Sequence, residues 1–216
     1  MRARLVECAL LVFAEKGVGA SVIQDVIAAA DVAQGTFYNH FRTNEELLVA
    51  VSQELNNELM RLIESEVGAY DDPARRIASG LRLYLHTARQ YPLLARFVCQ
   101  VGLLVAGPNN LIYEYLPPHI AAGQESGKFQ LLAVEVALDL IAGTMLAAVQ
   151  RLATDEPGEN YPEQVVTAIL RGLGLSSAQA NRLVALPLAP LAPLPGSLME
   201  RGHARMSGVG SEDVRR

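Results

Sequence analysis

Residues 21–46 constrain the fold more strongly than any other part of the chain. Ser21 and Gln24 have the S-x-x-Q spacing of a capping box, which predicts the start of a helix. Apolar residues then recur at helical spacing and can share one buried face: Val22, Ile23, Val26, Ile27 and Ala30. Asp31 follows where the chain must turn, because Asp tolerates left-handed backbone better than most residues. These features predict a short helix that ends in a tight turn.

A second short helix is predicted over residues 33–41, directly after the turn. Phe37 and Phe41 lie four residues apart and therefore face inward together. The outward residues carry hydrogen-bonding groups and almost no charge: Gln34, Gly35, Thr36, Tyr38, Asn39 and His40. Thr43 and Glu46 form another capping-box pattern, which predicts the start of the next helix. Two short helices packed around a turn make a helix-turn-helix.

This stretch resembles the DNA-binding domain of the tetracycline-repressor (TetR) family of bacterial regulators, over about the first 50 residues. The matching residues are Phe13, Gly17, Val26, Ile27, Ala30, Val32, Gly35, Thr36, Phe37, Tyr38, His40, Phe41, Glu45, Glu46, Leu47 and Leu48. The resemblance implies a symmetric homodimer whose two recognition helices enter successive major grooves of double-stranded operator DNA. It also implies a variable helical domain that binds a small-molecule effector.

The resemblance assigns roles to the outward residues of the helix-turn-helix. Tyr38, His40 and Thr43 are expected to hold phosphates, although Tyr38 and His40 could instead be ordinary surface residues. The residues expected to reach base edges include Gln and Asn, which can form paired hydrogen bonds with adenine. Those residues are Gln34, Thr36 and Asn39. The full set of predicted DNA-binding residues is Gln24, Gln34, Gly35, Thr36, Tyr38, Asn39, His40, Thr43 and Asn44.

Charge does not by itself argue for DNA binding. Gln34 and Asn44 stand where members of the family usually carry Lys, so fewer cations are available for phosphates. Residues 1–44 hold as many acidic as basic side chains and are formally neutral when His40 is uncharged. The whole chain has a net charge of −5, which argues against a basic, non-specific nucleic-acid coat. The prediction of DNA binding therefore rests on the motif.

The rest of the chain keeps a helical pattern and shows no strand-like alternation, so an all-α fold is expected. Asp72 is predicted to cap one helix start, and Asn160 with Glu163 and Ser176 with Gln179 are predicted to begin two others. Pro117 and Pro118 are expected to bend or split the helix that contains them. The predicted helices span residues 3–16, 44–67, 73–91, 93–105, 110–124, 131–153, 161–172 and 176–186.

Three regions follow from this pattern. Residues 1–46 are expected to form the helix-turn-helix DNA-binding domain, and residues 47–186 a helical ligand-binding and dimerisation domain. Residues 187–216 are rich in Leu, Ala and Pro and then polar, which predicts a flexible tail that is disordered from about Gly196.

Residues 131–153 are apolar almost all round, and two interpretations compete. The stretch is long enough to span a membrane, but Glu135 and Asp139 lie inside it. An Asp near the centre of a span costs about 3 kcal/mol. The favoured interpretation is a helix buried both in its own subunit and against a partner, so no membrane association is expected. The resemblance implies that the last two long helices pair with their copies as a four-helix bundle.

Residues that could support an enzyme are missing from the sequence. His40, His86, His119 and His203 lie in separate segments without metal-ligand spacing, and neither a P-loop nor a G-x-S-x-G motif occurs. We therefore expect no enzyme activity, no metal and no cofactor. Cys99 could be a thiol sensor, but a lone Cys in an apolar helix is more often a small core residue. The start of the chain does not resemble a signal peptide, which favours the cytoplasm.

The resemblance implies an effector pocket among the helices of residues 73–153. Candidate lining residues are polar or aromatic groups in apolar helices, and core packing is the alternative role for each. They are Tyr84, His86, Phe97, Gln100, Tyr113, Tyr115, His119, Asp139 and Thr144. Few fixed charges predict a small, largely apolar effector. The sequence thus predicts a ligand-responsive transcriptional repressor. The alternative is a helical small-molecule carrier that has lost DNA binding.

Overall fold

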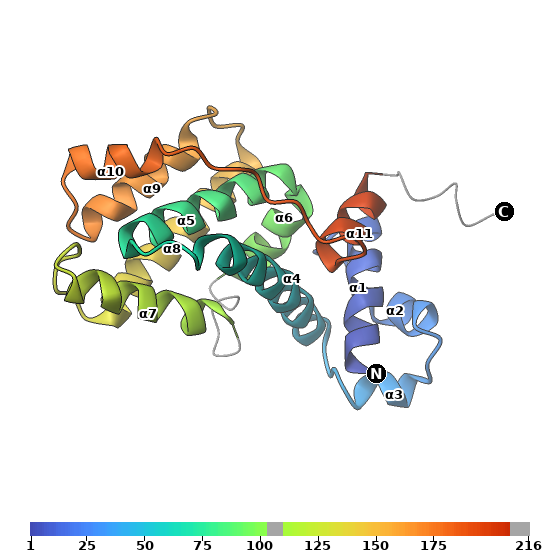
Figure 1. Ribbon diagram of the computed structural model, residues 1–216. Coiled ribbons are helices and arrows are strands. Elements are labelled where there is room, and N and C mark those ends of the chain that lie inside the picture. Colours follow the sequence, from blue (N-terminus) through green and yellow to red (C-terminus); the bar gives the residue numbers. More distant parts are fainter. Residues whose placement is uncertain (103–109, 208–216) are drawn as a thin grey trace.

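The computed structural model describes residues 1–102 and 110–207, and every regular element among them is a helix (Figure 1). The elements are α1 (Arg2–Lys16), α2 (Ile23–Ala29), α3 (Gln34–Tyr38), α4 (Asn44–Val67), α5 (Pro73–Gln90), α6 (Pro92–Val101), α7 (Ile112–Glu125), α8 (Val134–Thr154), α9 (Tyr161–Gly172), α10 (Ser177–Val184) and α11 (Leu198–Met206). Helices α1–α3 form a head, helices α5–α10 form a larger body, and α4 runs from one to the other. The all-α prediction is confirmed.

The head is held together by the apolar residues predicted to face inward. Val22, Val26 and Phe37 are fully buried, and the ring of Phe37 lies 6.0 Å from the ring of Phe41. Asp31 has a φ of 49°, so it adopts the left-handed backbone that the turn requires. Helices α2 and α3 therefore pack around the predicted turn and leave the outer side of α3 uncovered.

The two predicted capping boxes of the head form differently from the expectation. Ser21 does not cap α2. The start of α2 is instead held by the side chain of Asn44, the first residue of α4. Asn44 Oδ1 accepts from the Val22 N–H at 3.1 Å, and Asn44 Nδ2 donates to the Ala20 carbonyl at 3.1 Å. Thr43 Oγ1 does accept from the Glu46 N–H, but the Glu46 carboxylate accepts from the backbone of Arg42. At α2, the side chain of Asn44 from α4 thus takes the place of the predicted Ser21 cap.

Local signals in the body mostly give the predicted elements. Asp72 caps α5, and Ser176 with Gln179 forms a complete capping box at α10. Helix α7 is continuous across Pro117 and Pro118, so the prediction of a split helix is wrong. The carbonyls that lose their donors there belong to Tyr113 and Glu114, two exposed residues whose carbonyls water can satisfy.

Helix α6 ends at Val101, where Gly102 takes a φ of 61°. The sequence predicted this helix to continue to about Val105, which lies outside the described residues.

Helix α8 is long and apolar enough by composition to cross a membrane. Among the described residues it is the one helix of this kind, and 28% of its most apolar window is buried within the chain. Its buried residues face the helices of the body, which it contacts through α5, α6, α7 and α9. The helix is therefore built into the protein on one side and exposes apolar and small residues on the other.

The predicted disorder from about Gly196 is wrong for the described part of the tail. Residues 198–206 form α11, which lies against α1 of the head (Figure 1). Ser197 caps this helix by accepting from the Glu200 N–H, a local signal that the Pro-rich run before it obscures. Residues 208–216, which also belong to the predicted tail, lie outside the described residues.

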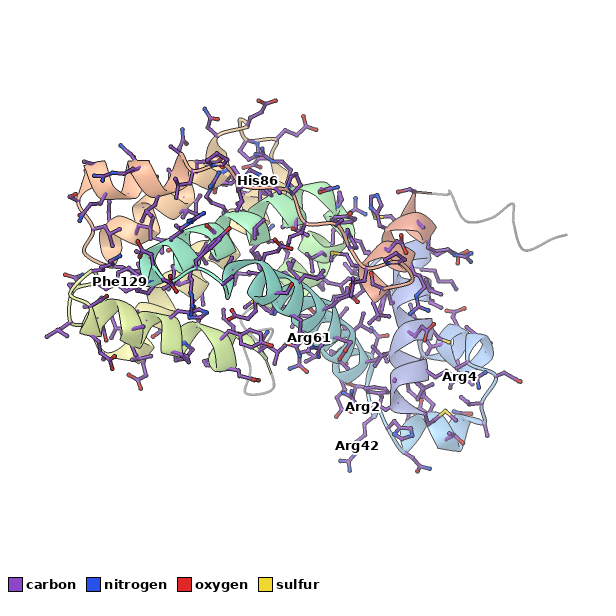
Figure 2. The ribbon with its side chains drawn as sticks, viewed as in Figure 1. Arg2, Arg4, Arg42, Arg61, His86 and Phe129 are labelled. Carbon is purple, nitrogen blue, oxygen red and sulfur yellow. The ribbon has the colours of Figure 1, made fainter. Side chains whose placement is uncertain are left out.

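The contact between α7 and the loop after it generates a stability prediction. A Cβ on Gly123 would lie 2.0 Å from Cδ2 of Phe129, whose ring is buried (Figure 2). Gly123→Ala should therefore lower the free energy of unfolding by about 2 kcal/mol, because the ring must leave its site. Urea denaturation measures this difference. Gly35→Ala has open space around the new Cβ and should be neutral or slightly stabilising, and equal stability of both variants would contradict the packing.

Candidate DNA interface and effector cavity

Helix α3 presents a polar, uncharged surface. Gln34, Gly35, Tyr38, Asn39 and His40 are exposed, whereas Thr36 is half-buried. Tyr38 is 42% exposed, and its ring packs edge-on against Phe37 with 5.5 Å between the ring centroids. Within the described residues, the side chains of Gln34, Thr36 and Asn39 make no hydrogen bond. These three side chains are therefore available to an outside partner.

The remaining predicted DNA-binding residues lie at the edges of α3. Gln24 is exposed on α2, and Thr43 is exposed just before α4. Asn44 is half-buried and uses its amide to join the starts of α2 and α4, as described above. Of the nine predicted residues, seven are therefore exposed, Thr36 is half-buried on α3, and Asn44 makes an internal contact.

The neutral charge of the head is distributed unevenly. Lys16 Nζ lies 2.6 Å from Asp25 Oδ1, and Glu7 and Glu15 pair with Arg201 and Arg205 of α11. Three further cations of the head are exposed: Arg2, whose guanidinium lies 5.1 Å from the centre of the Phe41 ring, Arg4 and Arg42 (Figure 2). None of the three forms an ion pair with a described residue. A count of the charges of residues 1–44 does not include Arg201 and Arg205, which pair with the two carboxylates of α1.

A cavity of about 100 Å³ lies inside the body. Its walls are mostly apolar and come from α4, α5, α6, α7 and α8, with Gly102 and Asn110 beside them. Met60 and Ile63 come from α4, Leu81 from α5, and Ile141 and Met145 from α8. The mostly apolar lining is typical of a site for a small apolar molecule.

Two hydrogen-bonded groups of polar side chains line the cavity, together with Arg76, whose Nε donates to the Tyr70 carbonyl. The Tyr84 hydroxyl donates to Asn56 Oδ1 at 2.7 Å, and Asn56 Nδ2 donates to Asn110 Oδ1 at 3.0 Å. Burial raises the pKa of Tyr84, with a smaller contribution from Cys99, so the phenol stays protonated. The second group is His119, whose Nε2 lies 3.1 Å from Glu64 Oε2. Each group can offer hydrogen bonds to a hydroxyl of a ligand.

Three of the nine predicted ligand-binding residues line the cavity: Tyr84, Tyr115 and His119. The other six do not. Tyr113, Gln100 and Asp139 are exposed, and Thr144 is half-buried on α8 away from the lining. Phe97 is fully buried, but its ring packs on Phe13 of α1 with 5.7 Å between centroids. Phe97 therefore packs in the contact between α1 of the head and α6 of the body, and does not line the cavity.

His86, the sixth, belongs to an ion-pair network on the other side of α5 (Figure 2). Its Nε2 lies 2.9 Å from Glu163 Oε1, and Arg82 Nε lies 3.2 Å from the same oxygen. Burial raises the pKa of Glu163, but hydrogen bonds from His86 and Arg82 lower it to a net value below the usual one. Glu163 was predicted to cap α9 with Asn160. It instead ties α9 to α5.

Sequence reasoning missed Asn56, Asn110, Glu64 and Arg76, which also line the cavity. Asn56 carried a signal, since an Asn on the apolar side of a long helix needs a buried partner. The thiol-sensor alternative for Cys99 gains no support, because burial raises its pKa and keeps the thiol protonated.

Two family models match the chain. One is described as "Bacterial regulatory proteins, tetR family" and matches residues 5–51, which contain the head. The other is described as "Tetracyclin repressor-like, C-terminal domain" and matches residues 72–185, which contain the body. The chain belongs to the tetR family. The resemblance found in the helix-turn-helix is therefore confirmed and extends to the body.

Similar proteins of known name agree with this assignment. The HTH-type transcriptional repressor DhaR of Mycobacterium sp. (strain GP1) is 31% identical over 183 residues, which cover 80% of this chain and 92% of DhaR. The HTH-type transcriptional repressor Rv3405c of Mycobacterium tuberculosis (strain ATCC 25618 / H37Rv) is 37% identical over 67 residues, 31% of this chain and 36% of that protein. RolR in complex with resorcinol is 26% identical with a TM-score of 0.77, over 88% of this chain and 96% of RolR.

The protein is accordingly a ligand-responsive DNA-binding transcriptional regulator, and its family consists of regulators rather than enzymes. The fold and function predicted from the helix-turn-helix are confirmed at this level. The individual DNA-binding and effector-binding residues remain predictions.

Asn39 at the end of α3 provides a test of base recognition. Asn39→Ala should relax the sequence preference at one position of each half-site, because the exposed amide is lost while the packing of α3 is unchanged. Selection from random duplexes measures this preference. Ala28→Gly on the outer face of α2 alters an exposed residue outside α3 and serves as control. An unchanged preference in Asn39→Ala would refute the assigned role.

Proposed function

We propose that this tetR-family regulator is a cytoplasmic homodimeric repressor, released from its operator by a small, neutral, largely apolar effector. The observation that carries the proposal is the position of α4. Met60 and Ile63 of α4 line the cavity, and Asn44 at its first residue holds the start of α2. A ligand that changes the position of α4 in the body therefore changes the orientation of the head.

Helices α8 and α9 offer the surface for a dimer. The outer side of α8 carries exposed or half-exposed apolar and small residues, and α9 lies beside it. The α8 residues are Val136, Leu140, Gly143 and Ala147, and the α9 residues are Val165 and Ala168. Pairing of both helices with their copies would cover these residues in a four-helix bundle. Such a dimer would set two α3 helices about 34 Å apart, one turn of DNA, or a multiple of it.

On DNA, the exposed amides and hydroxyls of α3 are proposed to approach the major groove. Gln34, Thr36 and Asn39 would read base edges, while Tyr38, His40 and Thr43 would hold phosphates. Arg2 and Arg42 add two cations at the rim of this surface. Since Asn44 is engaged within the head, its proposed contribution to DNA binding is to fix α2 against α4.

The effector is proposed to be a single-ring molecule with one or two hydroxyl groups. An apolar protein cavity of about 150 Å³ binds benzene, so a cavity of about 100 Å³ limits the effector to a single small ring and excludes a long chain. Tyr84 with Asn56, and His119 with Glu64, can accept or donate hydrogen bonds to hydroxyl groups. The structure of the similar protein RolR in complex with resorcinol supports this class of ligand.

Tyr84 tests the effector site. Resorcinol should raise the melting temperature of the protein and weaken its binding to operator DNA. Tyr84→Phe should lower the affinity for resorcinol about tenfold, because one buried hydrogen-bonding group is lost. Isothermal calorimetry measures the affinity. Tyr113→Phe, at an exposed position of α7 outside the cavity, should bind as the wild type does. Tight binding only of highly charged metabolites would sink the proposed effector class.

Ala147 tests the dimer. Ala147→Arg places a charge on the exposed side of α8 and should give a monomer that binds operator DNA at least tenfold more weakly, because one of two linked heads is lost. Analytical ultracentrifugation and fluorescence anisotropy measure mass and affinity. Ala178→Arg, at an exposed position of α10, is the matched control. A dimer that survives Ala147→Arg with full affinity would place the interface elsewhere.

A further inference from the structure

The C-terminal helix α11 contacts the head and the body at the same time. It packs against α1 of the head, against α4, and against α6 of the body. The segment before it crosses the body from α10 to reach this position (Figure 1). Helix α11 therefore closes a second connection between head and body, in addition to α4.

The start of α11 is fixed to α4 by one carboxylate. Glu58 Oε2 accepts from the Leu198 N–H at 2.9 Å, and Glu58 Oε1 accepts from the Met199 N–H at 3.1 Å. The first N–H groups of a helix have no partner within the helix, and an anion there is also favoured by the helix dipole. Glu58 thus holds both the position and the direction of α11 relative to α4.

The middle of α11 approaches the head and the body closely at Gly202. A Cβ at this position would lie 2.9 Å from Leu93 Cδ2 of α6 and 3.3 Å from Leu10 Cδ1 of α1. Both leucines are buried, so they have little room to move. Met199, one turn earlier, is also buried. The absence of a side chain at Gly202 lets one helix touch both parts of the protein.

Two ion pairs complete the contact with α1, Arg201 with Glu7 and Arg205 with Glu15. Their side chains are 37–58% exposed, and pairs of that exposure contribute little to stability. Docking of α11 therefore depends on Glu58 and on the packing around Gly202. The ion pairs neutralise the two carboxylates of α1, Glu7 and Glu15.

The helices beneath α11 also line the cavity. Leu93 and Phe97 of α6 contact α11 and α1, whereas Val98 on the same helix lines the cavity. Glu58 lies between Asn56 and Met60, two cavity residues of α4. A movement of α4 or α6 at the cavity would therefore also displace the residues that α11 contacts.

We infer that α11 is a positioning brace: it holds the DNA-binding head at one angle to the body, and operator affinity depends on it. The inference rests on the proposed DNA binding, because the angle matters only if two heads must fit one operator. Without the brace the head samples several orientations about the start of α4. The apparent affinity then falls by the fraction of time spent in the competent orientation.

Gly202→Glu tests the brace in the full-length chain. A carboxylate between Leu10 and Leu93 cannot be buried without a partner, so α11 should leave its site and its amides should lose protection in hydrogen exchange. Ala204→Glu adds the same charge to the same helix at a half-exposed position outside the core and is the matched control. Glu58→Ala releases the other end of α11, and Glu58→Gln, which keeps one acceptor, should restore part of the effect.

Two readouts separate positioning from folding. Spin labels at Gln24 and Ala178, in a background with Cys8 and Cys99 replaced by Ser, report the distance between head and body. Its distribution should broaden in Gly202→Glu and Glu58→Ala and stay narrow in Ala204→Glu. Affinity for a duplex selected by the wild type should fall about tenfold in the first two variants, as expected when one orientation in ten is competent.

The two experiments test the repressor function and the positioning role of α11 separately. Failure of the wild type to select any duplex would reject the proposed repressor function, while the distance measurement would still decide whether α11 positions the head. Narrow distributions and full affinity in both Gly202→Glu and Glu58→Ala would overturn the brace.

Discussion

The structure depends on α4 behaving as one rigid rod. Its 24 residues form an unbroken helix, from the Thr43 cap to Val67. Asn44 at one end is bonded to the start of α2, and Asn56 lies about 18 Å further along the helix at the cavity. A helix resists bending because every interior turn is hydrogen-bonded and its apolar side is packed along its length. Head and cavity therefore cannot move independently where they share this helix.

An acidic chain can present a surface for DNA when its charges are separated in space. The net charge of −5 describes the whole molecule, but the acidic residues of α1 are paired with arginines that come from the far end of the sequence. The exposed face of α3 carries neutral donors and acceptors, while Arg2 lies beside His40, Glu45 and Glu46 at its edge. Few phosphate contacts predict a shallow dependence of affinity on salt, so that base contacts carry a larger share of the proposed recognition.

The sequence predicted what depends on local interactions. Asp31, the caps at Asp72 and Ser176, and the apolar stripes fix helices through neighbours a few residues away, and these appear where expected. Predictions failed where a partner distant in sequence decides the role of a side chain. Phe97 packs on α1 rather than the cavity, Glu163 binds Arg82 and His86 rather than its own helix start, and α11 is ordered by α1, α4 and α6. Spacing along one helix cannot reveal which of several apolar surfaces that helix will meet.

The buried polar network in the cavity indicates how a small ligand could be distinguished from apolar filling. Asn56 of α4 accepts from Tyr84 of α5 and donates to Asn110, whose Oδ1 also accepts from the Ile112 N–H at the start of α7. Three parts of the body thus share one chain of hydrogen bonds, and a broken bond would leave a polar group buried at a cost of about 1–3 kcal/mol. A ligand shifts a conformational equilibrium only as far as it binds the two states unequally. In the proposed effector site, a ligand hydroxyl that replaces one of these hydrogen bonds would bind directly to Asn56, a residue of α4. The proposed ligand contact and the attachment of the head at Asn44 would then lie on the same helix.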